Sequence, residues 1–150
     1  MKKILFIASL FIATFANALN IGDATPTFAI KDQFEKAHTI AADTKTVIVA
    51  GDRDASEVIR DYLLEKGKGF LESNKAYYVA DISGMPSLIT KFFALPKMKE
   101  YPFSILLVDE EQSKSFTKKE GTITVYTVNA GKVSDVKYLK TAAELASVFK

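Results

Sequence analysis

The pattern of hydrophobic and polar positions along the chain predicts alternating strands and helices. The β-branched run Thr46–Ala50 ends at Gly51 and has the character of a buried strand. Apolar residues then recur at helical spacing over residues 55–66, and Gly67 follows as a stop signal. The predicted buried face of this helix consists of Ala55, Val58, Ile59, Tyr62 and Leu63.

A second strand and a second helix follow. Ala76–Ala80 has strand character, and Pro86 suits the first turn of a helix. We expect this helix to end at Leu95-Pro96, because proline disfavours helical geometry in the residue before it. Its apolar residues form one stripe, which predicts that they are buried: Leu88, Ile89, Phe92 and Phe93.

The last third of the chain predicts a strand, a loop, a hairpin and a helix. Phe103–Val108 is nearly all apolar, which is typical of a central strand, and the charged residues 109–120 predict a solvated loop. Thr141 and Glu144 form a capping box at the start of the final helix. The hairpin comprises a strand, a turn and an edge strand over Thr122–Val128, 129–132 and Val133–Leu139.

The beginning of the chain has the three parts of a secretory signal peptide. Lys2 and Lys3 precede an apolar run over residues 4–15, and Ala18 marks the predicted cleavage site. The run is shorter than the roughly 20 residues that span a bilayer. We therefore expect a signal peptide at 1–18, a single domain at 19–150, a periplasmic or secreted location, and no membrane span after cleavage.

Charge and cysteine content exclude several classes of function. The 150-residue chain has 20 basic and 18 acidic residues, and loss of Lys2 and Lys3 leaves 18 of each. This near-neutral balance, without clusters of lysine or arginine, speaks against a nucleic-acid partner. The chain has no cysteine, which excludes disulfides, thiol chemistry and a lipid anchor on cysteine.

Motifs for cofactors are missing as well. No Gly-x-Gly-x-x-Gly turn or phosphate loop occurs, so we expect no nucleotide, flavin or nicotinamide cofactor. His38 is the only histidine and no ligand spacing surrounds it, so we expect no metal site and interpret it as an exposed residue of a small hairpin within residues 19–40. That hairpin would follow Pro26 and turn over residues 31–36.

The order of these elements resembles the thioredoxin-like fold over roughly residues 46–149. Residues 77–81, Tyr-Tyr-Val-Ala-Asp, are similar to the second strand of thioredoxins and the acid that follows it. Residues 21–28 are similar to the opening of peroxiredoxins and of exported thioredoxin-like proteins, which begin with a small hairpin. The resemblance implies an α/β, three-layer βαβαββα sandwich with an N-terminal hairpin, preceded by the signal peptide.

The resemblance also implies an active site that this chain has altered. The family places a cis-proline before its central strand, which makes Pro102 the candidate for that bond. It also has a Cys-x-x-Cys motif where this chain has residues 51–57, Gly-Asp-Arg-Asp-Ala-Ser-Glu. The proline, threonine and peroxidatic cysteine of peroxiredoxins are absent from the same stretch. The fold carries over, and the redox activity does not.

Eight residues near this altered site are candidates for binding a partner. For residues 52–54 the alternatives are anion binding at a helix N-terminus, with Arg53, and simple capping, since Asp54 and Glu57 have capping-box spacing. For the loop 81–86 the alternatives are a functional loop and a simple connection between the strand and the next helix, in which Asp81 or Ser83 caps that helix. The candidates are Asp52, Arg53, Asp54, Asp81, Ser83, Met85, Tyr101 and Pro102.

Two interpretations of function remain open at this point. The first is a binding module that engages a peptide or protein partner through the face around Pro102, and sequence does not separate it from a dimer formed at a sheet edge. The second is a cysteine-independent enzyme that uses carboxylates near Asp52, Asp54 and Asp81. The apolar cluster over residues 92–103 is either ordinary core or part of a groove.

Overall fold

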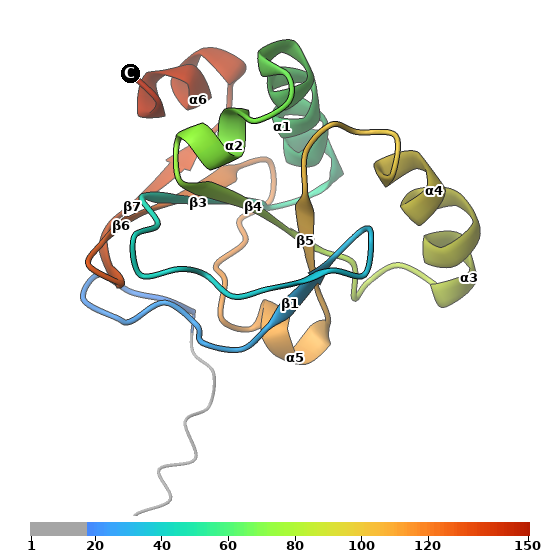
Figure 1. The fold of residues 1–150 in the computed structure, drawn as a ribbon, viewed down its shortest axis with the longest axis horizontal. Coiled ribbons are helices and arrows are strands. Elements are labelled where there is room, and N and C mark those ends of the chain that lie inside the picture. The colour runs from blue at the N-terminus through green and yellow to red at the C-terminus, as the bar shows by residue number, and fades with distance from the viewer. Residues whose placement is uncertain (1–17) are drawn as a thin grey trace, which may run out of the picture.

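The computed structural model describes residues 18–150, which form a mixed seven-stranded sheet with helices (Figure 1). Residues 1–17 of the predicted signal peptide lie outside the described residues. The strand order is β2-β1-β5-β4-β3-β6-β7, in which β3, β4 and β5 are parallel. The strands are β1 Ile30–Asp32, β2 Ala37–His38, β3 Thr46–Ala50, β4 Ala76–Asp81, β5 Ile105–Val108, β6 Ile123–Asn129 and β7 Lys132–Leu139.

The helices lie on both sides of this sheet. Figure 1 shows α1, α2 and α6 on one side and α5 on the other. The helices are α1 Arg53–Lys66, α2 Phe70–Ser73, α3 Ser87–Ile89, the π-helix η1 Thr90–Ala94, α4 Leu95–Met98, α5 Glu110–Ser113 and α6 Ala142–Val148. None of the helices in the described part of the chain has the length and apolarity to cross a bilayer. The predicted α/β order, the N-terminal hairpin and the edge strand β7 are confirmed.

The core is divided into two layers by the alternation of side chains along the strands. Ile48 of β3 packs with Ile59 of α1 and Leu145 of α6. Its neighbours Val47 and Val49 belong to the opposite layer. Because successive strand residues point to opposite faces, a continuous apolar strand such as β3 contributes to both layers.

The second helix differs most from its prediction. Residues 87–98 are continuously helical through Pro96, and the predicted buried stripe of Leu88, Ile89, Phe92 and Phe93 is exposed. Within the helix, the amide of Leu95 bonds the carbonyl of Thr90, five residues back. A wider π turn lets the chain pass a proline, which has no amide hydrogen to donate and would clash with a regular turn.

The charged segment 109–120 is more ordered than a solvated loop. Asp109 and Gln112 form a capping box at α5. Ser113, Ser115 and Phe116 are buried, and Phe116 packs edge-on against Tyr126 of β6. The charges that predict a loop lie on the outer side of this segment, so the few core residues between them were missed.

The N-terminal hairpin holds polar side chains in the interior. Gln33, in its turn, is 1% exposed; its side-chain amide donates to the carbonyls of Met98 and Phe103 and accepts from the amide of Ile105. Asp32 is 1% exposed at its side chain and lies 2.6 Å from Nε2 of His38. His38 is thus half-buried and paired, and the prediction of an exposed histidine is wrong.

Candidate functional site

The start of α1, where thioredoxins carry their redox motif, is closed by backbone contacts. The carboxylate of Asp52 caps α1 by accepting from the amide of Ala55 at 2.9 Å and also accepts from the amide of Gly121 at 2.7 Å. A Cβ on Gly51 would lie 2.0 Å from the carbonyl oxygen of Lys119. The residues at this position therefore anchor the loop 119–122 against α1.

Asp52, not Asp54, is therefore the capping residue of α1. The alternative of an anion site involving Arg53 has little to support it, because the guanidinium is exposed and lies 3.3 Å from the carboxylate of Glu57. The Asp52 carboxylate also occupies the end of the helix where an anion would sit. Capping is the function that the geometry gives this turn.

A second carboxylate, that of Asp81, lies at the end of β4. It accepts from the amide of Ser83 at 2.8 Å and forms an ion pair with Lys118. Burial raises the pKa of Asp81, but the hydrogen bonds from Lys118 and Ser83 outweigh it and leave that pKa below its ordinary value. Asp81 stabilises its own turn, and the predicted capping of the next helix by Asp81 or Ser83 is wrong.

The loop 81–86 and the start of α1 enclose a hollow of about 650 Å³. Its walls combine these polar residues with an apolar centre made by Ala50, Ala80, Met85 and Met98. Both methionines that follow residue 18 line it. The flexible thioether side chain adapts to ligands of different shape, so methionine is common at surfaces that accept varied partners.

A smaller hollow of about 350 Å³ adjoins the first between α1 and the helix 87–98. The two hollows share Arg53, Ser56, Ala80, Met85 and Met98. Beyond them the smaller hollow is lined mainly by apolar and aromatic residues, including Ile89, Phe93 and Tyr101. We refer to the two together as the methionine groove.

A pair of neutral polar side chains also lines this groove. The hydroxyl groups of Ser56 and Tyr78 are 3.0 Å apart. Burial raises the pKa of Tyr78 to about 12, against the opposing effect of its bond to Ser56, so the phenol is neutral at physiological pH. Because Tyr78 is only 2% exposed, its hydroxyl positions Ser56, and the half-buried hydroxyl of Ser56 is the part of this pair that can meet a bound polar group.

The structure brings most of the eight candidate residues together. Asp52, Arg53, Asp81 and Met85 line the larger hollow, and Tyr101 lines the smaller one. The other three candidates lie apart: Asp54 is exposed on α1, Ser83 lines a separate hollow, and Pro102 lines another with Tyr101 and Phe34.

Pro102 also differs from its expected geometry. Among residues 18–150 no peptide bond is cis, so the cis bond that the family resemblance implied at Pro102 is absent. Gln33 holds the connector 98–105 around Pro102 instead. Its side chain bonds the backbone carbonyls of Met98 and Phe103 and the backbone amide of Ile105. A hydrogen-bonded side chain fixes this segment without a cis bond.

Several groove residues were missed by sequence reasoning. The hydrophobic pattern places Ser56 and Tyr78 in the body of a helix and a strand, and Lys118 in a solvated loop. Met98 stands out only as part of an apolar cluster. Whether they line the groove depends on which residues of α1 and β4 face the same hollow, and the hydrophobic pattern does not contain that information.

Comparisons with known structures agree with this fold. No protein-family model and no curated protein matches the chain. The thioredoxin domain of a thiol-disulfide oxidoreductase from Bacteroides vulgatus matches with a TM-score of 0.56 and 14% identity, over 89% of this chain and 100% of that one. StoA from Bacillus subtilis matches with a TM-score of 0.56 and 14% identity, over 85% and 100%. Peroxidoxin BcpB from Mycobacterium tuberculosis matches with 0.51 and 17%, over 87% and 94%.

These similarities define the class of the protein by its fold. The chain has a thioredoxin-like fold. It contains no cysteine, so it is a thioredoxin-fold protein without redox cysteines. At identities this low the likeness concerns architecture, and function has to be argued from the groove itself.

Proposed function

We propose that this protein is an exported, non-redox binding protein that holds a segment of a peptide or protein partner in the methionine groove beside the Pro102 connector. The observation that carries the proposal is the groove itself, which consists of two adjoining hollows around Met85 and Met98. Export rests on the signal-peptide pattern of residues 1–18.

The chemistry of the groove suits a peptide better than a small charged ligand. Its centre is apolar, and the polar groups at its rim are already paired: Arg53 with Glu57, and Asp81 with Lys118. The half-buried hydroxyl of Ser56, which buried Tyr78 positions, is the neutral polar group that remains to meet a partner's main chain. Apolar side chains of a partner would enter the hollows, and hydrogen bonds to its main chain would orient it.

The alternative function, a cysteine-independent enzyme, needs a carboxylate that exchanges protons near neutral pH. Asp52 uses both oxygens to accept backbone amides, and the pKa of Asp81 is lowered by its partners. Asp52 is therefore committed to holding the backbone, and the lowered pKa of Asp81 keeps that carboxylate ionised. This arrangement favours binding over acid–base catalysis.

The test combines peptide selection with groove variants. Peptides selected from a random displayed library against the wild-type protein are synthesised, and their affinities are measured by calorimetry. In the double variant Met85→Ala, Tyr101→Ala we expect affinity to fall at least about tenfold, since both side chains line the groove.

The matched control is Leu64→Ala, Tyr138→Ala, which removes similar exposed side chains outside the groove and should leave affinity unchanged. Equal affinity of the groove variant and the wild type, or failure to select any peptide, would count against the proposal. Cell fractionation with a measured N-terminal mass tests export separately.

A further inference from the structure

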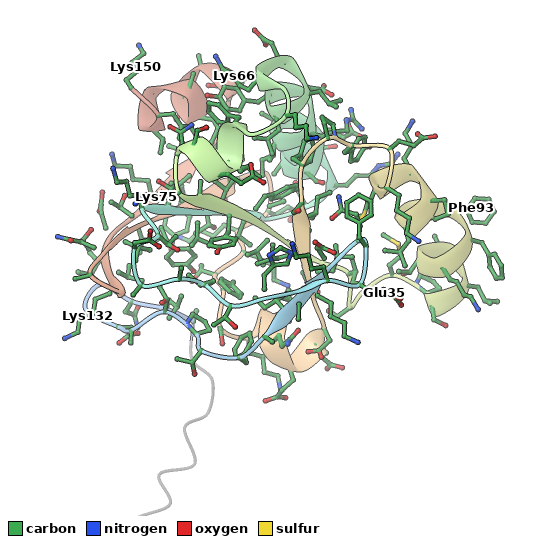
Figure 2. The ribbon with its side chains drawn as sticks, viewed as in Figure 1. Glu35, Lys66, Lys75, Phe93, Lys132 and Lys150 are labelled. Carbon is green, nitrogen blue, oxygen red and sulfur yellow. The ribbon has the colours of Figure 1, made fainter. Side chains whose placement is uncertain are left out.

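The helix 87–98 exposes more apolar surface than any requirement of the fold explains. Four large apolar side chains on it are solvent-exposed: Leu88 at 67%, Ile89 at 45%, Phe92 at 60% and Phe93 at 68%. Their spacing, two adjacent pairs four residues apart, places them on one side of the helix. Figure 2 shows Phe93 at the outer edge of the molecule.

Two of the four residues do not belong to the methionine groove. Ile89 and Phe93 border the smaller hollow, whereas Leu88 and Phe92 line neither hollow. Leu88 and Phe92 therefore form a ridge that projects from the helix. A projecting apolar ridge can insert into a deformable apolar medium. Binding a peptide requires the opposite shape, a hollow that the side chains of the peptide can enter.

The charges along this helix are mainly positive. Residues 82–100 contain three lysines, Lys91, Lys97 and Lys99, and one acid, Glu100, whose carboxylate lies 3.6 Å from the ammonium of Lys97. The ammonium of Lys91 lies 5.6 Å from the ring centre of Phe92, beside the ridge itself. An exposed apolar surface flanked by lysines is the pattern of helices that lie in the interface of anionic membranes.

The same charges disfavour a second copy of this chain as the occupant. In a two-fold dimer built on this helix, Lys91 and Lys99 of one copy would approach the same lysines of the other. The acidic residue next to them, Glu100, is already paired with Lys97 of its own chain. Like charges brought together in this way oppose association, while an anionic surface complements them.

We propose that the ridge formed by Leu88 and Phe92, with Lys91 and Lys99 around it, docks this protein on the surface of anionic phospholipid membranes. The helix lies flat in the interface, and Leu88 and Phe92 enter the acyl region. The lysines remain among the headgroups. This function is separate from peptide binding and leaves the larger hollow accessible.

Vesicle flotation tests the proposal. The protein is used in the form in which cells produce and process it. The probes are vesicles of phosphatidylcholine alone and vesicles of phosphatidylcholine and phosphatidylglycerol in equal parts. We expect binding to the anionic vesicles to exceed binding to the neutral ones, by about fivefold for each lysine engaged. High salt should reduce this difference. Every variant has the same N-terminus, so differences between variants report on the helix.

Two pairs of variants separate the apolar and charged contributions. Leu88→Ser, Phe92→Ser should lower binding to anionic vesicles at least about tenfold, whereas Ile21→Ser, Leu64→Ser, at exposed positions elsewhere, should not. Lys91→Gln, Lys99→Gln should lower binding to anionic vesicles alone, and the control Lys68→Gln, Lys140→Gln should have no effect. Thermal unfolding confirms that each variant is folded.

The proposal is overturned if the wild type fails to bind anionic vesicles, or if it binds them equally with and without Leu88 and Phe92. It is also overturned if replacing Leu88 and Phe92 abolishes binding to a protein partner but leaves vesicle binding unchanged. Because Met85 and Tyr101 are unchanged in all these variants, loss of vesicle binding with retained peptide affinity separates this function from the groove.

Discussion

The hairpin turn and the helix 87–98 border the same connector, residues 98–105. The hairpin buries polar side chains, whereas the helix exposes apolar ones. The hairpin buries Gln33 and Asp32 and gives each several hydrogen bonds. The helix exposes large apolar side chains, of which Leu88 and Phe92 line neither part of the methionine groove. Buried polar groups with full hydrogen bonding are typical of structural roles, and exposed apolar patches are typical of interaction surfaces. The contrast divides this region into a rigid support and a surface for partners.

The strongest test of this contrast is Gln33→Leu. The substitution leaves the buried carbonyls of Met98 and Phe103 and the amide of Ile105 without their partner. We expect the free energy of unfolding to fall by about 4 kcal/mol, measured by urea denaturation. Gln112→Leu, at a half-buried position with fewer bonds, should cost about 1 kcal/mol. Similar losses for the two variants would mean that Gln33 is not a special support.

The wall of the larger hollow at the start of α1 is tested by Gly51→Ala. The new methyl group would meet the backbone of Lys119 and Thr122, which cannot move as a side chain can. We expect a loss of about 2 to 3 kcal/mol in urea unfolding. Gly84→Ala is the matched control, because no heavy atom outside Gly84 and its two chain neighbours lies within 4 Å of the position that its methyl group would take. The stability of this variant should change by less than about 0.5 kcal/mol. An unaffected Gly51→Ala variant would show that the loop 119–122 moves easily.

The hydrogen bond between the buried carboxylate of Asp32 and His38 predicts a pH dependence. Burial raises the pKa of Asp32, but bonds from His38 and from the amides of Lys36 and Phe34 outweigh it and lower that pKa. A carboxyl with a lowered folded pKa adds stability above its unfolded pKa, near about 3.9, and loses it as pH falls through the folded value. Asp32→Asn should therefore cost about 1 to 2 kcal/mol at pH 7, and the difference from wild type should vanish in strong acid.

The control for this prediction is Asp43→Asn, which breaks an exposed pair with Lys75. Surface pairs contribute little, so we expect a change below about 0.5 kcal/mol and no comparable pH dependence. A constant difference between Asp32→Asn and wild type from neutral to acid pH would contradict a lowered pKa at Asp32.

The strands and the long helix were predictable because their hydrophobic periods are local properties of the sequence. β3 and α1 follow from the runs at 46–50 and 55–66 to within a few residues. The roles of Gln33 and Gly51 were not predictable, because each depends on backbone from a segment 65 or more residues away. The apolar stripe of the second helix was placed in the core because periodicity identifies a face without saying what covers it.

The smallest expected effect on stability lies in that helix. Phe92→Ser removes a side chain that is mostly in solvent, so the free energy of unfolding should change by less than about 0.5 kcal/mol. Phe103→Ser, in the core beside Tyr78 and Tyr101, should cost at least about 3 kcal/mol. Urea denaturation measures both. If Phe92→Ser also destabilised the fold strongly, this side chain would support the structure itself, and the division between a rigid hairpin and an interacting helix would fail.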